Sequence, residues 1–160
     1  EARAGAMSIM DKACRLKKTD QQRRKTLFDL YLRRHDRINN WDLVDLGAQH
    51  VVGRYLLDRP RDLLYDLARS NSLWERRTAY LLRQDQLDDT FAIAELLLED
   101  EEDLIHKAVG GWLRQAGKQD HERLLPFLEQ HAARMPRTML TYAMEHLDKD
   151  QKAYYRGLTN

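Results

Sequence analysis

The sequence predicts an all-α protein, and three observations indicate it. Apolar residues recur at helical spacing almost from end to end, and no stretch shows the alternation of a half-buried strand. Only seven of the 160 residues are Gly and three are Pro, whereas Leu, Ala, Arg and Glu, which favour helices, are abundant. A motif of basic and apolar residues also recurs at a fixed offset. The expected architecture is therefore an α-solenoid with a concave groove.

The recurring motif is visible in three segments. "LWERRTAYLLRQ" begins at residue 73 and "LIHKAVGGWLRQ" at residue 104, an offset of 31 residues, and both end in Leu-Arg-Gln. A further step of 31 residues reaches "MPRTMLTYAMEH" at 135. A recurring helix pair of this length is typical of a solenoid, although a plain helical bundle would have a similar composition.

Each helix is predicted from its apolar period and its end signals. The expected helices are 2–17, 21–35, 42–57, 61–69, 73–84, 89–99, 103–116, 121–133, 137–147 and 149–157. Ser72 and Glu75 have the spacing of a capping box. Pro126 should kink or split its helix, and Gly117 suits a helix end.

Composition restricts the class of protein. A single cysteine, Cys14, excludes an internal disulfide and favours a cytoplasmic location. No apolar run approaches the roughly 18 residues of a membrane span, so no membrane partner is expected. The chain opens on "EARAGAMSIM", which is helix-like and has no initiator Met. We therefore expect residues 1–160 to be a single repeat domain that lacks its N-terminal helices.

Charge is unevenly distributed, although the net charge is only +1. Residues 1–84 hold 18 Lys and Arg and 11 acidic residues, whereas residues 85–103 hold nine acidic residues and no base. Ordinary solvated surface is one interpretation of this pattern. The alternative is a basic face for polyanions with an acidic segment on another face.

Two charged residues lie on apolar helix faces. The residues three and four positions from Arg77 are apolar or aromatic: Leu73, Trp74, Tyr80 and Leu81. Asp45 shares a face with Trp41 and Val52. Because a desolvated charge without a partner is costly, Asp45 either pairs with Arg77 or serves the N-terminal end of its own helix. Alternatively, both charges line a solvated groove and act on a ligand with a cationic and hydrophobic character.

Other kinds of site have little support. The six His residues lack metal-ligand spacing, and there is no nucleotide-binding glycine motif, so neither a metal nor a cofactor is expected. His106 and Lys107 fit a polar helix face better than a catalytic pair.

Four stretches resemble, in order and spacing, the AlkD-type DNA alkylation repair glycosylases over about residues 1–147: "NNWDLVD", "SLWERRTA", "DLIHKAVG…LRQAGK" and "MPRTMLTYAMEH". The resemblance implies HEAT-like repeats and a concave basic groove that holds double-stranded DNA. It also implies excision of cationic N3- and N7-alkylpurines without base flipping. By the same resemblance Trp41 is the first aromatic residue of the site, Asp45 the catalytic carboxylate, and Arg77 a residue near the lesion backbone.

One departure from the family pattern concerns its second tryptophan. The family usually has Trp directly after the glycine of "KAVGW", whereas this chain has Gly111 there and Trp112 next. One residue turns a side chain by about 100° around a helix. We therefore expect Trp112 in the core; the alternative is that a local helix bulge, made easier by the glycine pair, brings it to the groove.

Three further basic residues recur at places similar to that of Arg77 in successive repeats: Lys107, Arg114 and Arg137. They could form a track of phosphate contacts together with Arg77. The sequence thus predicts a monomeric alkylpurine DNA glycosylase. A non-catalytic HEAT-type module that binds DNA structures or a protein partner is the alternative.

Overall fold

The computed structural model describes residues 1–79 and 87–158, and all regular structure within these ranges is helical. The all-α prediction is therefore confirmed for these residues. The chain forms two compact units, Glu1–Leu81 and Leu82–Asn160, here called the N-terminal unit and the C-terminal unit. Within the described ranges, no helix has the length and apolar character needed to cross a membrane.

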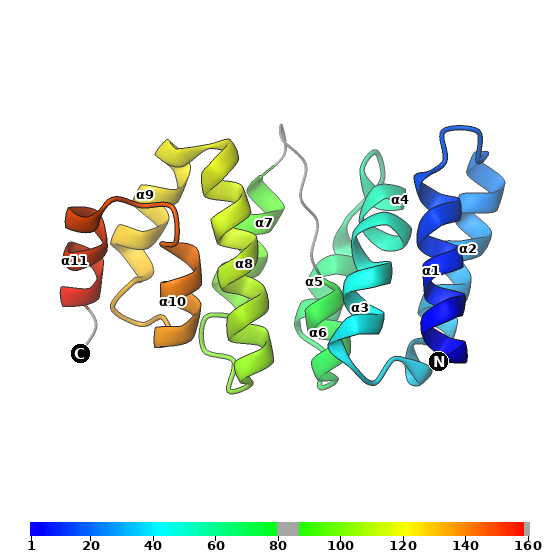
Figure 1. Ribbon diagram of the computed structural model, residues 1–160, viewed down its shortest axis with the longest axis horizontal. Coiled ribbons are helices and arrows are strands. Elements are labelled where there is room, and N and C mark those ends of the chain that lie inside the picture. Colours follow the sequence, from blue (N-terminus) through cyan, green and yellow to red (C-terminus); the bar gives the residue numbers. More distant parts are fainter. Residues whose placement is uncertain (80–86, 159–160) are drawn as a thin grey trace. The chain divides into compact units, whose positions relative to one another are not determined.

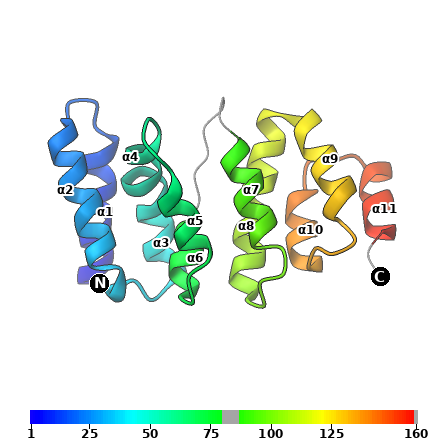
Figure 2. The same cartoon turned by 180° about the vertical axis from the view of Figure 1, so that it is seen from behind.

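The N-terminal unit consists of paired helices around an apolar core. Its elements are α1 (Ala2–Arg15), α2 (Gln21–Arg33), the 3₁₀ turn η1 (His35–Arg37), α3 (Trp41–Gly47), the π-helical turn η2 (Ala48–Gly53), α4 (Arg54–Leu56), α5 (Asp62–Ala68) and α6 (Leu73–Thr78). Helices α1 and α3 lie side by side (Figure 1), and α2 lies nearer the viewer from the opposite side (Figure 2). Fully buried side chains in this core include Tyr31, Val44, Val51 and Leu64.

The C-terminal unit contains α7 (Asp88–Leu96), α8 (Asp103–Gln119), α9 (His121–His131), α10 (Arg137–Ala143) and α11 (Lys149–Gly157). Helices α8 and α10 are in close contact (Figure 1). Gly110 permits this approach, because a Cβ at that position would lie 2.5 Å from the backbone oxygen of Met139 and 2.7 Å from Cβ of Tyr142. The close packing of α8 on α10 therefore depends on a residue without a side chain.

The N-terminus of α6 differs from the expected capping box. Ser72 is the cap residue, but its side chain makes no capping hydrogen bond. Ser70 instead donates its hydroxyl to Glu75 and accepts a hydrogen bond from Ser72 N–H at 3.0 Å. The capping-box prediction is wrong here because Ser70, earlier in the chain, engages the Glu75 carboxylate. A capping box does form in α11, between Asp148 and Gln151.

The expected split of a helix at Pro126 does not occur, and the helix expected to end near Gly117 continues past it. Helix α9 continues through Pro126 without a break, and its buried residues on both sides of the proline, Leu124 and Phe127 among them, hold it in place. Helix α8 continues past Gly117, where a Cβ would overlap the side chain of Leu124. The glycine therefore serves helix packing. The expected helix 42–57 is instead interrupted by the π-helical turn η2.

The expected helix 73–84 is described only as far as Thr78. The rest of that segment, including Tyr80 and Leu81, lies outside the described residues. The remaining expected helices are found with ends that differ by a few residues.

Candidate functional site

Asp45 and Arg77 form an ion pair between two helices of the N-terminal unit. Nε of Arg77 donates to Oδ1 of Asp45 at 3.0 Å, and Nη2 donates to Oδ2 at 2.9 Å. This two-point geometry fixes both side chains more firmly than a single contact would. The pairing of these two residues, 32 positions apart, was one of the alternatives that the sequence left open, and the structure confirms it.

The two partners differ in exposure. The Arg77 side chain is 12% exposed and that of Asp45 is 49% exposed. An ionised carboxylate has about four lone-pair sites, and the guanidinium uses one on each oxygen. Asp45 is therefore held in place on one side and remains accessible to water or a ligand on the other.

Local sequence explains how α3 presents these groups. Asn40 caps the helix, and its side chain accepts a hydrogen bond from Leu43 N–H at 2.9 Å. The helix therefore begins at Trp41, whose ring is 50% exposed. Asp45 follows one turn later on the same face, while Leu43 and Val44 point into the core. An exposed aromatic ring and an accessible carboxylate thus lie next to each other.

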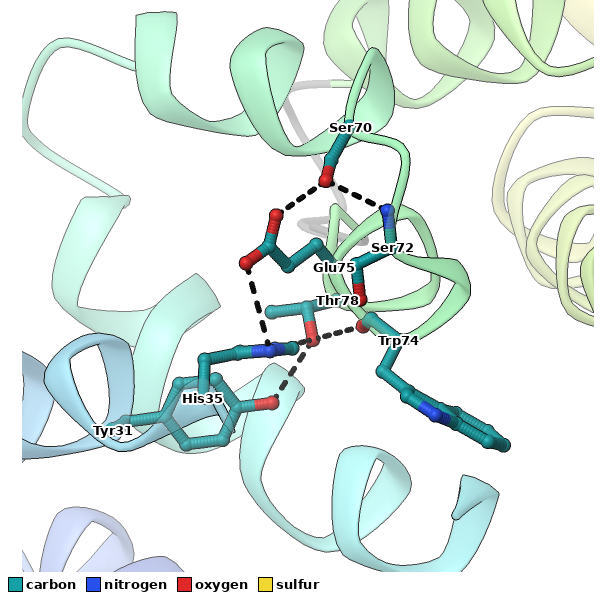
Figure 3. Close-up of polar contacts among 7 residues, drawn as sticks. All are labelled: Tyr31, His35, Ser70, Ser72, Trp74, Glu75 and Thr78. Atoms are coloured by element: carbon teal, nitrogen blue, oxygen red, sulfur yellow. Dashed lines mark hydrogen bonds and ion pairs between the residues drawn. The ribbon is translucent and has the colours of Figure 1, made fainter. Parts of the chain in front are cut away.

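A buried polar cluster lies at the junction of α2, η1 and α6 (Figure 3). Its central residue is Thr78, which follows Arg77 directly and is fully buried. Tyr31 and His35 approach Thr78 from α2 and η1 (Figure 3). Burial lowers the pKa of His35 below its ordinary value, and the opposing effect of the Glu75 carboxylate is smaller. His35 is therefore the neutral partner of a buried hydroxyl group.

The glycine pair of the C-terminal unit has two different environments. Trp112 is 8% exposed and lies on the buried face of α8, which is a regular helix without a bulge at this point. This burial agrees with the expected core placement. Gly111 has open space around its Cβ position. No aromatic side chain therefore extends from α8 at the place where the family pattern has one.

The expected basic residues of the C-terminal unit have different partners. Lys107 pairs with Asp103 at 2.5 Å, and Arg114 pairs with Glu145. Arg137 is exposed and lines a small surface pocket of about 60 Å³. These three lie in a different unit from Arg77, so a common track remains a prediction.

Three residues near these sites were missed by the sequence analysis. Arg156 shares the pocket of Arg137, but it lies in the last expected helix, 149–157, to which the sequence assigned no site. Tyr31 and Thr78 have no local signal, because a buried tyrosine and threonine occur in many helices. Of the three, only Arg156 has a feature visible in the sequence, its positive charge, that could have marked it as a candidate for anion binding.

Within residues 1–79 and 87–158, no group of histidine, cysteine and acidic side chains could hold a metal ion. A family model described as DNA alkylation repair enzyme matches residues 1–147. No curated protein and no solved structure matches the chain.

Proposed function

Because the chain belongs to the family of DNA alkylation repair enzymes, we propose that it is a DNA glycosylase that excises cationic N3- and N7-alkylpurines from duplex DNA. The observation that supports this activity is the Asp45 carboxylate, which Arg77 holds while half of its surface stays accessible. The exposed ring of Trp41 next to it provides a flat apolar surface for a sugar.

The chemistry needs little more than electrostatic stabilisation. Alkylation at N3 or N7 gives the purine a positive charge, so the base leaves with the electrons of the C1′–N bond. The sugar then develops oxocarbenium character, which a fixed carboxylate stabilises. Water adds to C1′ and loses a proton, which leaves a free alkylpurine and an abasic site. The base stays in the duplex throughout and is not flipped into a pocket.

Trp41 and Arg77 have supporting roles in this proposal. The face of an aromatic ring attracts a developing cation, which favours a sugar placed against Trp41. Arg77 orients Asp45 and offers a positive charge to the backbone near the lesion. Its low exposure supports the orienting role in particular.

We infer that the paired helices are HEAT-like repeats of one α-solenoid domain over residues 1–160, with double-stranded DNA in its concave groove. Side-by-side pairs such as α1 with α3 and α8 with α10 support repeated packing within each unit. The recurrence at 31 residues supports the same architecture.

A pair of arginines supports phosphate binding in the C-terminal unit. Arg137 and Arg156 line the same small pocket, together with Thr141. Neither arginine side chain has an ion pair or hydrogen bond with a described residue. Two like charges at one hollow favour an anion, and a DNA backbone phosphate fits this requirement. Lys107 and Arg114 are weaker candidates, because each already has an acidic partner.

Asp45→Asn tests the proposed chemistry. The variant should release 7-methylguanine from duplex DNA at least ~100-fold more slowly, the usual cost of losing a transition-state electrostatic group. DNA affinity should stay nearly unchanged, and the unfolding free energy should fall by about 1 kcal/mol or less because Asn retains an acceptor. The rates come from chromatography of the released base.

Asp42→Asn is the matched control, since Asp42 lies on the same helix, is exposed and does not pair with Arg77. It should retain the wild-type rate. If Asp45→Asn instead loses activity only in proportion to thermal stability, the ion pair has a structural role.

A second candidate, a non-catalytic DNA-binding module, is favoured by one observation. Gly111 leaves the family's second aromatic position empty, and Trp112 is buried. Both candidates bind DNA, so binding does not separate them. Wild-type protein that binds alkylated duplex DNA but releases no base would support the module.

A further inference from the structure

One hydroxyl group makes three hydrogen bonds at the centre of the buried cluster (Figure 3). Oγ1 of Thr78 donates to the backbone oxygen of Trp74 at 2.8 Å. It also lies 3.0 Å from the Tyr31 hydroxyl and 3.0 Å from Nε2 of His35. A hydroxyl has one proton and two acceptor sites, so Tyr31 and His35 both donate to Thr78. Because Thr78 is fully buried, water cannot replace these donors.

The same cluster fixes a helix that is too short to be stable alone. Helix α6 has six residues, and isolated helices of that length do not persist in water. Its orientation therefore depends on contacts with other elements. Thr78 makes such contacts at the C-terminal end of α6, directly after Arg77. Near the other end, Glu75 accepts the hydroxyl of Ser70.

Tyr31 also contacts the helix that carries Asp45. A Cβ on Gly47 would lie 3.1 Å from Cδ2 of Tyr31 and closer to Cε2, so the ring packs directly against the α3 backbone two residues after Asp45. Burial raises the pKa of Tyr31, and the negative charge of Asp45 adds to this effect. The hydrogen bond from Tyr31 to Thr78 lowers the pKa by a smaller amount. One side chain thus contacts both elements that form the ion pair.

We propose that Tyr31 and Thr78 are positioning residues, whose hydroxyl contact sets α6 against α3 so that Arg77 meets Asp45 with both donors. The inference rests on the proposed role of Asp45. Its physical basis is that a two-point ion pair requires correct distance and angle at both oxygens. A displacement of about 1 Å at such a group can reduce a reaction rate by ~100-fold.

Two conservative substitutions test the hydroxyl contact. Tyr31→Phe keeps the ring against Gly47 and removes only the hydroxyl, and Thr78→Val keeps the shape of Thr78 but removes its acceptor. Tyr31→Phe should lower kcat for 7-methylguanine release by about 10-fold with little change in KM. Thr78→Val should have a larger effect, because it leaves two donors without an acceptor. Thr78→Ser restores the hydroxyl and should restore most of the rate.

A matched control separates positioning from general stability. Tyr155→Phe removes a buried hydroxyl of the C-terminal unit, which donates to the backbone oxygen of Leu125 at 3.4 Å. It should leave kcat unchanged. In an Arg77→Gln background, Tyr31→Phe should have no further effect on kcat, since it acts through Arg77. If the factors by which the two substitutions lower kcat multiply in the double variant, the proposal is contradicted.

A second measurement does not depend on activity. The Nε proton of Arg77 bonds Asp45, so its exchange with solvent, followed by NMR, reports whether the pair is formed. Tyr31→Phe should speed this exchange by about 10-fold, and Tyr155→Phe should not change it. Unchanged exchange in Tyr31→Phe overturns the positioning role. If the wild type releases no base while exchange responds as expected, the glycosylase proposal fails and the positioning of the ion pair stands.

Discussion

Trp41 in the N-terminal unit and Trp112 in the C-terminal unit lie in the two segments that resemble the aromatic motifs of the family, but their environments are opposite. Trp41 is the first residue of α3 and is 50% exposed, next to Asp45. Trp112 lies in the middle of α8 and is 8% exposed, between the buried residues Val109 and Leu113. Of these two tryptophans, Trp41 alone is presented to solvent.

The difference comes from helix phase. In α8 the position with open space around it belongs to Gly111, and Trp112, about 100° further around the helix, turns toward the core. An aromatic side chain at position 112 therefore lies on a different face of α8 from one at position 111. The phase of an aromatic residue on its helix therefore says more about a site than the number of aromatic residues near a motif.

Truncating each tryptophan should give the largest contrast. Trp112→Ala should lower the unfolding free energy by about 3–5 kcal/mol, as loss of a buried aromatic ring does. Trp41→Ala should lower it by about 0.5 kcal/mol or less, because surface substitutions have small effects, and should slow base release. Urea denaturation and release assays measure the two effects. Equal losses of stability in the two variants would remove the distinction.

The adjacent glycines should respond to alanine with opposite signs. Gly110→Ala should destabilise by about 1–3 kcal/mol, because the new Cβ would overlap α10. Gly111→Ala should stabilise by up to about 1 kcal/mol, since its Cβ position is open and alanine favours helix. Thermal or urea unfolding of both variants checks the signs. A stabilised Gly110→Ala would contradict the close packing of α8 on α10.

Gly111→Trp should give the C-terminal unit the aromatic surface that it lacks. A sugar cation in contact with an added ring gains about 0.5–2 kcal/mol, which is roughly a twofold to thirtyfold faster release of 7-methylguanine. Gly111→Leu is the control, because it adds a side chain without an aromatic face. If the two variants release base at the same rate, the open position does not face the sugar.

The smallest expected effect concerns phosphate contacts. Arg137→Gln and Arg156→Gln should each reduce the slope of log affinity against log salt by about 0.9, the value for one phosphate contact on duplex DNA. Arg134→Gln serves as the control, because Arg134 already pairs with Glu99 at 3.3 Å. Binding is measured by fluorescence anisotropy between low and physiological salt. A slope that is unchanged in both variants excludes the shared pocket as a phosphate site.

Much of the fold could be predicted because helices are encoded locally. The apolar period located the described helices to within a few residues. The core placement of Trp112 was expected from its shift by one residue relative to the family pattern. Asp45 and Arg77 could be singled out because a charge on an apolar face is unusual wherever it occurs. Their catalytic and DNA-contacting roles stay predictions.

Contacts between distant segments had no such local signal. The sequence offered the pairing of Asp45 with Arg77 only as one alternative, because it depends on how α3 packs against α6. The contact of Tyr31 with Thr78, which spans 47 residues, was not expected at all. Pro126 likewise stays inside a helix because of its buried neighbours, against its local preference. Sequence by itself determined which face of each helix is apolar, since this follows from 3.6 residues per turn. Only tertiary structure decided which polar groups meet between those faces, because a buried donor or acceptor is satisfied by whichever partner the packing brings to it.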